Sequence, residues 1–413
     1  VEAGVAFASA LSGATADERR DRQRRAAEEF VVGGALVEGS AMLHAVLSDA
    51  GVQLRTSKLG VMASILWNQM VTDFFLVMRL LAMPVPQSSE HDELRELQQV
   101  YELVGHRMSL IDSLSAFDFQ LRALRLALLL DRPREIVRGL GGHATFSGNL
   151  GNWWNTFRMR RELALAIEIA NTARFEDLDN DIRVFEGFVA HTLGEFEEAI
   201  EHLERAEQVF VETEERSQFE LNMTRVFMLY SLRERGELSR LSERVLRYVD
   251  DAERRGDRFT ATTLSRAFNI VWLAAEGPDA ARLQLRRATW VPIESGFHLQ
   301  HWYALRANAE LALYEGRVRE GFDDFSRELD RLHRSTLSRA VQAVRGEALW
   351  LHGRLIVALR KELKSPRRHR RKLARISRKL ASEKGRRYLD AWSAMLRASI
   401  AMVDDRREDA RLV

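Results

Sequence analysis

The chain has 413 residues, of which 46% are hydrophobic and 30% charged, and its formal net charge is +2. It contains no cysteine, which excludes a disulfide framework and a thiolate metal site. Six prolines are too few for the turns of a β-sandwich or barrel of this length. Charges spread through apolar segments are typical of amphipathic helices, and no segment alternates with period two. The sequence therefore predicts an all-α protein.

Residues 1–180 are expected to form divergent helical repeats, with an earlier copy of the repeat at 26–51. The most apolar stretch runs from Val61 to Pro86, and it predicts an apolar helix over 61–83. This stretch also contains Asn68, Gln69, Asp73 and Arg79. Because polar groups are costly at bilayer depth, we expect an amphipathic helix buried in the protein and not a membrane span.

The glycine-rich segment 139–152 (GLGGHATFSGNLGN) could be taken for a phosphate-binding loop. Such a loop needs a lysine and a preceding strand, and this segment has neither. We expect a flexible connection between helix pairs. Motifs for nucleotide binding, kinase catalysis and metal coordination are absent from the sequence. The prediction is therefore that this chain has no catalytic residues, no cofactor and no metal site.

Residues 181–359 carry a regular array, marked by a glycine wherever one apolar helical pattern gives way to the next. These glycines are Gly194, Gly236, Gly277, Gly316 and Gly353, at intervals of 42, 41, 39 and 37 residues. Glycine suits the left-handed position that ends a helix and lets the chain reverse. The spacing predicts antiparallel helix pairs of about 40 residues, and such repeats stack into a solenoid.

Small residues recur at fixed offsets from these glycines. Seven residues before a turn glycine stand Gly187, Ala309 and Gly346, and five residues after one stand Ala199, Gly321 and Ala358. A glycine inside a helix costs about 1 kcal/mol relative to alanine, and close approach of two helices would offset that cost. The predicted structural repeat positions are Gly187, Gly194, Ala199, Ala206, Ala309, Gly316, Gly321, Gly346, Gly353 and Ala358.

Residues 360–387 form a basic segment that we expect to be an insertion, followed at 388–413 by the start of a further, truncated helix pair. The segment has 14 Lys and Arg against two Glu, a net charge of +12. Such a block could contact nucleic acid or an anionic surface, yet it has no aromatic residue for base stacking. A solvated helical extension is favoured over a polyanion contact. The candidate contact residues are Arg367, Arg368, Arg370, Arg371 and Lys372.

The segment Gly187–Ala206, with Gly194, Phe196, Ala199 and Leu203 inside it, resembles the tetratricopeptide repeat. Four longer stretches resemble the C-terminal helical region of large bacterial Ser/Thr protein kinases and related AAA-like signalling ATPases. They are AAEEFVVGGALVEGSAMLHAVLSDAGV (26–52), SLIDSLSAFDFQLRALRLALLLDRPREIVRGL (109–140), AERRGDRFTATTL (252–264) and GFHLQHWYALRANAELALYEGR (296–317). The resemblance implies a right-handed superhelical array that regulates kinase and ATPase modules lying elsewhere in a longer protein.

Three functional hypotheses follow. The chain is a non-catalytic regulatory or partner-binding tail of a kinase/ATPase signalling protein, the tail of an ATP-dependent transcriptional regulator, or a stand-alone adaptor. In each case the expected partner is a protein or peptide on the concave face of the array. The kinase and ATPase modules of the longer protein would be intramolecular partners. The lack of cysteine and of a visible secretory signal leads us to expect a cytoplasmic location.

Overall fold

A computed structural model describes residues 1–55, 57–81, 91–109, 111–213, 218–288, 296–359, 366–383 and 386–403. Helices account for 86% of these residues, and none of them lies in a strand. The described segments contain twenty-one α-helices and one short 3-10 helix. The predicted all-α fold is confirmed.

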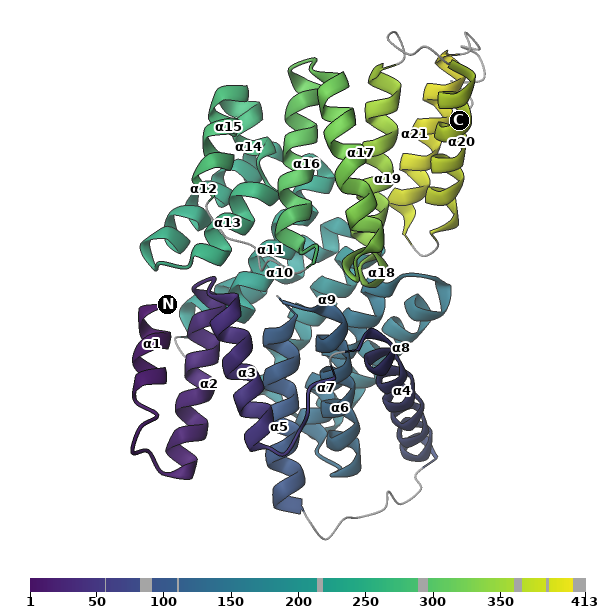
Figure 1. Cartoon of the computed structure of the whole chain (residues 1–413). Coiled ribbons are helices and arrows are strands. Elements are labelled where there is room, and N and C mark those ends of the chain that lie inside the picture. The colour runs from purple at the N-terminus through teal and green to yellow at the C-terminus, as the bar shows by residue number, and fades with distance from the viewer. Residues whose placement is uncertain are drawn as a thin grey trace.

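The helices form two layers, which Figure 1 shows one above the other. The lower layer comes from the first part of the chain. Its helices are α1 (Glu2–Ser9), α2 (Ala16–Val32), α3 (Leu36–Asp49), α4 (Lys58–Leu80), α5 (His91–Met108), α6 (Ser113–Leu129), α7 (Pro133–Leu150) and α8 (Trp153–Ala173).

The upper layer comes from the later part of the chain. Its helices are α12 (Leu238–Arg254), α13 (Arg258–Ala267), α14 (Ile270–Ala275), α15 (Pro278–Arg287), α16 (Leu299–Tyr314), α17 (Val318–Arg334), α19 (Gln342–Ala358), α20 (Pro366–Ser382) and α21 (Arg387–Val403). Near the junction of the layers lie η1 (Glu176–Leu178), α9 (Asp179–Leu193), α10 (Phe196–Glu212), α11 (Gln218–Arg235) and α18 (Leu337–Ala340).

Consecutive helices pack as pairs, as in α2 with α3, α7 with α8 and α9 with α10. The turn between α9 and α10 shows how the sequence directs the reversal. Gly194 has a φ of +83°, and its N–H donates to the His191 carbonyl at 3.0 Å. The next N–H, from Glu195, donates to the Ala190 carbonyl at 2.9 Å. This left-handed cap ends α9 and lets the chain reverse into α10.

The two layers contact each other directly through residues far apart in the sequence. Arg386, before α21, donates to the Gly148 and Thr192 carbonyls at 2.9 Å each. Arg345 of α19 donates to the Leu150 carbonyl at 3.1 Å. At the other side of the molecule, Phe259 of α13 packs against buried residues of the α2–α3 pair. The layers are therefore held together at both sides.

A helix is present where the sequence predicts one over 61–83, but the expectation that this helix is buried is wrong. Helix α4 spans Lys58–Leu80, and positions 82 and 83 lie outside the described residues. By length and composition alone, α4 could cross a membrane, but only 28% of its most apolar window is buried in the protein. The reason is that its polar side chains face inward, as described below.

The expectation of a loop at 139–152 is also wrong, because residues 139–150 belong to α7. Its glycines lie where neighbouring helices approach closely. A Cβ atom added to Gly141 would lie 2.1 Å from the Phe185 ring, and one added to Gly148 would lie 2.5 Å from Met159 Sδ. Tight packing therefore outweighs the poor helix propensity of these glycines.

The basic segment is not an insertion over its described part. Residues 366–382 form helix α20, which packs against α19 and α21. Its apolar side chains Leu373, Ile376 and Leu380 are buried in a cluster with Leu389 and Leu396 of α21. Residues 388–403 therefore complete the pair that α20 begins, and they do not start a new one. Residues 360–365 and 384–385 lie outside the described residues.

Candidate ligand-binding cavity

A cavity of about 1430 Å³ lies between the two layers. Helices α5, α6 and α7 line it from the lower layer, and α16 and α19 from the upper one. Helices α9 and α11 close it at the junction. Ligand pockets for drug-sized molecules usually measure roughly 300–1,000 Å³. This cavity is thus large enough for a ligand longer than a typical metabolite.

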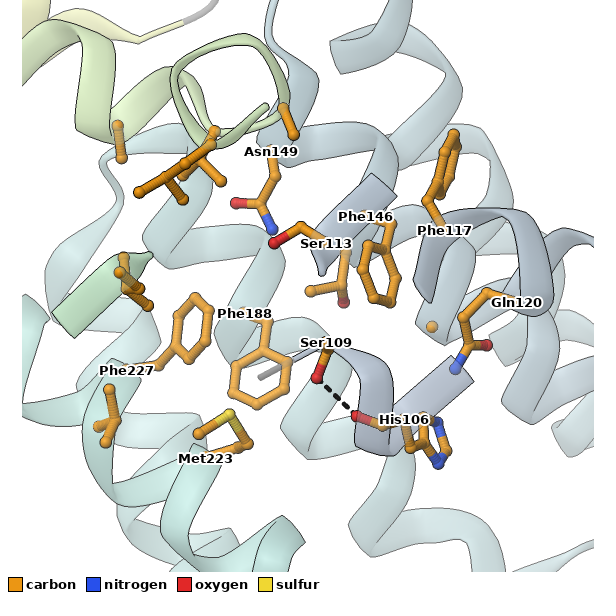
Figure 2. Close-up of a pocket in the computed structure, with 18 of the residues that line it drawn as sticks. His106, Ser109, Ser113, Phe117, Gln120, Phe146, Asn149, Phe188, Met223 and Phe227 are labelled. Atoms are coloured by element: carbon orange, nitrogen blue, oxygen red, sulfur yellow. Dashed lines mark hydrogen bonds between the residues drawn. The ribbon is translucent and has the colours of Figure 1, made fainter. Parts of the chain in front are cut away.

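Many aromatic side chains line the cavity. Figure 2 shows Phe117 and Phe146 on one side of the hollow and Phe188 and Phe227 on the other. The rings of Phe188 and Phe227 lie 4.4 Å apart, centroid to centroid. Further rings in the wall are Phe185, Phe196, Phe210, Phe219, Tyr230, Phe259, Phe297, Trp302, Tyr303, Tyr388 and Trp392. Such a surface favours apolar and aromatic ligand groups.

One part of the wall carries a buried ion cluster around Glu347 of α19. Arg306 Nη1, from α16, lies 3.0 Å from both carboxylate oxygens of Glu347. Trp302 Nε1 donates to the same carboxylate at 3.1 Å, and Arg233 of α11 is a further ion-pair partner. Burial alone would raise the pKa of Glu347, but the guanidinium groups of Arg306 and Arg233 outweigh it and lower the pKa to about 2. This carboxylate therefore stays ionised and ties three helices together.

A second group of titratable side chains lies where α5, α7 and α11 meet the cavity. Burial raises the pKa of the Glu102 and Glu220 carboxyls. Burial, helped by the charges of Arg107 and Arg138, lowers the pKa of His106 to about 4. The charged forms are therefore disfavoured at this end of the cavity.

His191 of α9 also lines the cavity. Its Nδ1 is 2.9 Å from the Ser231 hydroxyl, which itself donates to the Phe227 carbonyl at 3.0 Å. Burial, together with the charge of Arg386, lowers the pKa of His191 to about 3. The imidazole is therefore neutral near pH 7, which suits its contacts with the aromatic rings around it.

The strongest charges of the cavity wall are largely neutralised by ion pairs. Glu347 pairs with Arg306, and Arg138 pairs with Asp181 at 3.2 Å. In the part of the chain that the structure describes, no three His, Cys, Asp or Glu side chains gather in a way that could hold a metal ion. The rest of the wall combines aromatic rings with scattered hydroxyl and amide groups.

None of the predicted repeat positions lines this cavity, and most lie at helix contacts. Gly187 sits against Leu203, Gly321 against Ala312 and Gly346 against Leu389. Ala199, Ala206 and Ala309 are buried, and Gly194 and Gly316 have positive φ angles at turns.

Two predicted repeat positions differ from expectation. Gly353 is not a turn residue, because it lies inside α19 and packs against Leu396 of α21. The periodicity misleads here because Gly346 and Gly353 are seven residues apart on one face of α19, and that face meets α21. Ala358 is exposed near the end of α19 and does not lie at a helix crossing.

Four of the candidate polyanion residues lie on or beside the exposed side of α20, and none of these four lines the cavity. Arg367, Arg370 and Arg371 are exposed, and the Lys372 ammonium lies 5.2 Å from the centre of the Phe322 ring. The side chain of Arg368 lies outside the described part of the structure. The helix thus presents a basic face to solvent while its apolar face is buried.

Comparison with known proteins gives no match, either to a protein-family model or to a curated protein.

Sequence reasoning missed the cavity itself. A local signal was present, since α9 and α11 each carry closely spaced aromatic residues: Phe185 and Phe188, and Phe227 and Tyr230. Such residues are usually core residues, and only the packing of the two layers leaves their rings facing a hollow.

Proposed function

We propose that this chain is a non-catalytic helical-repeat scaffold that binds a peptide segment of a protein partner in the cavity between its layers. The observation that supports this proposal most strongly is the cavity of about 1430 Å³, whose aromatic side chains come from both layers. A volume above the usual small-molecule range favours an extended ligand with apolar side chains. The proposed arrangement of the helices is a right-handed superhelical array of the tetratricopeptide type.

The wider role follows from the resemblance and remains a proposal. The chain would be the regulatory tail of a cytoplasmic bacterial Ser/Thr protein kinase or ATPase signalling protein, and the peptide would report the state of a partner to those modules. The transcriptional-regulator and adaptor hypotheses use the same cavity. They differ in what else the longer protein contains, such as a DNA-binding helix pair.

Fluorescence titration tests the binding function. The probe is N-phenyl-1-naphthylamine, an apolar dye whose emission rises in an apolar site. Ser113 of α6 and Ala343 of α19 line the cavity from opposite layers. Ser113→Phe and Ala343→Phe should therefore fill it, and each should weaken dye binding at least tenfold.

Ser239→Phe, at an exposed position of α12, is the matched control and should bind the dye like the wild type. A ten-residue peptide of alternating Leu and Ser should displace the dye from the wild-type chain. Equal dye binding by all four chains, or failure of the peptide to compete, would contradict the proposal.

A further inference from the structure

Helix α4 buries a row of polar side chains and leaves most of its large apolar side chains outside, although Val61 is buried and Leu76 packs against the core. On the inner side, Ser64, Asn68 and Thr72 are at most 4% exposed. Asn68 Nδ2 donates to Asp118 Oδ1 at 3.2 Å, and Arg122 donates to the Ser64 hydroxyl at 3.0 Å. Polar contacts with α6 therefore contribute to holding α4 in place. Its apolar side chains are left at the edge of the molecule, where Figure 1 shows α4 beside α8.

The outer side carries a continuous apolar stripe. Its large members are between 48% and 81% exposed: Leu59, Met62, Leu66, Trp67, Met70, Phe74, Val77 and Leu81. On α8, Trp153, Trp154 and Phe157 are exposed by 68%, 49% and 52%. A bidentate pair between Arg158 and Asp73, at 2.9 and 3.0 Å, links the two helices. We call these eleven side chains the α4–α8 face.

The face is large enough for a stable interface. Taking roughly 150–250 Å² for each large side chain, the eleven present on the order of 1,000 Å² of exposed apolar surface. The largest apolar patch on a typical monomer is roughly 300–600 Å². A standard protein–protein interface buries about 800 Å² on each partner. The exposed apolar area of the α4–α8 face is therefore sufficient for a dimer interface without any other surface.

One row of exposed residues along the stripe is symmetric about its centre, with Met62 and Trp67 lying beside this row. The exposed residues Leu59, Ala63, Leu66, Met70, Phe74, Val77 and Leu81 are spaced 4, 3, 4, 4, 3 and 4 along α4 and its C-cap. Reversing this order about Met70 gives the same spacing. A repeat of eleven residues stays close to the turn of an ideal helix, so the stripe runs nearly straight along the axis. Such a stripe can pack on an antiparallel copy of itself.

We propose that a second copy of this chain covers the α4–α8 face, as a two-fold symmetric dimer in which the two α4 helices lie antiparallel. The symmetry axis passes close to Met70, so that Leu66 of one copy meets Phe74 of the other and Leu59 meets Leu81. Two-fold interfaces use the same patch on both subunits, and this one is self-complementary. The arginines beside the stripe favour a protein partner over an anionic membrane, because Arg79 and Arg158 are already paired with Asp131 and Asp73.

Single-cysteine cross-linking tests the geometry, because the chain has no cysteine of its own. Met70→Cys places two thiols at the symmetry axis and should give a disulfide-linked dimer in high yield under mild oxidation. In Leu59→Cys the two thiols would lie about 33 Å apart along the helices, since each residue adds about 1.5 Å. That variant alone should stay uncross-linked. Mixed with Leu81→Cys chains, it should give a linked heterodimer.

Light scattering with size-exclusion chromatography gives an independent readout. The wild-type chain should run as a dimer, and Leu66→Glu and Phe74→Glu should run as monomers with unchanged circular dichroism. Val211→Glu replaces a valine on α10 that is 59% exposed, and it is the matched control that should remain dimeric. A monomeric wild-type chain at 100 µM, or equal cross-linking at positions 59 and 70, overturns the proposal. Binding of the monomer to phosphatidylcholine–phosphatidylglycerol vesicles, lost in Leu66→Glu, would assign the face to a membrane and overturn it too.

Discussion

Glu347→Gln removes the carboxylate that joins three helices in the wall of the cavity. Arg306 is only 3% exposed and lies 3.0 Å from both oxygens of that carboxylate. The substitution leaves its guanidinium buried without the paired negative charge. Breaking a buried ion pair by removing one partner typically costs about 3–5 kcal/mol. We expect the free energy of unfolding to fall by that amount at pH 7.

The expected shift in melting temperature follows from the size of the chain. An unfolding entropy of roughly 2.1 cal/mol/K per residue gives about 0.9 kcal/mol/K for 413 residues. The Tm of Glu347→Gln, measured by scanning calorimetry, should therefore fall by about 3–6 °C. Glu320→Gln is the matched control, because Glu320 pairs with Arg317 at 2.8 Å while both side chains are exposed. Such a pair contributes about 1 kcal/mol or less.

The double variant Arg306→Met/Glu347→Met separates the ion pair from simple loss of packing. It removes the charges of Arg306 and Glu347 and keeps two long apolar side chains, while Arg233 retains its ion pair with Glu234. The double variant should therefore recover part of the lost stability. The reasoning is refuted if Glu347→Gln melts no earlier than Glu320→Gln, or if the double variant is less stable than Glu347→Gln.

Three other outcomes are expected. Ala199 of α10 is fully buried, so Ala199→Leu should cost about 1–3 kcal/mol in a denaturation experiment. Ala358→Leu, at an exposed position, should stay within about 0.5 kcal/mol of wild type. Equal effects would show that Ala199 is not tightly packed. The pKa of His191 is lowered to about 3 in the folded chain, so the unfolded chain binds an extra proton as the pH falls below about 6.5, and the fold loses stability. His191→Gln should lessen this loss between pH 6.5 and 4 by up to about 1.4 kcal/mol per pH unit. An unchanged dependence of stability on pH would contradict the neutral imidazole. Duplex DNA should bind the chain only weakly at about 0.15 M salt, where charges are screened beyond about 8 Å. The variant for this test changes five basic residues to Ser: Arg367, Arg368, Arg370, Arg371 and Lys372. Tight, salt-sensitive binding by the wild type that is lost in this variant would instead favour a polyanion contact.

The sequence predicted the fold class because helical periodicity and the shortage of turn residues are local properties. The turn at Gly194 was predictable for the same reason, since a left-handed cap needs only the glycine and its neighbours. The spacing argument failed at Gly353, where the glycine serves a contact with Leu396, more than forty residues later in the chain. The sequence alone does not show whether a glycine ends a helix or lets a neighbouring helix approach closely.

The orientation of α4 was not predictable from its hydropathy. Burial of apolar side chains is the usual expectation, but Asn68 and Ser64 find partners in Asp118 and Arg122 on α6. Those partners lie at least fifty residues away along the chain. The cavity escaped prediction for a similar reason, because its wall unites residues of α5 with residues of α19, which only the packing of the two layers brings together.

Hydrogen exchange with and without a bound ligand tests the central claim, that the two layers enclose one binding cavity. The ligand is N-phenyl-1-naphthylamine at saturating concentration, and exchange is followed by peptide-resolved mass spectrometry. The account predicts slower exchange in peptides of α6 and α7 from the lower layer and of α16 and α19 from the upper layer, all with the same dependence on dye concentration. Slower exchange confined to one layer, or found only in α4 and α8, would contradict it.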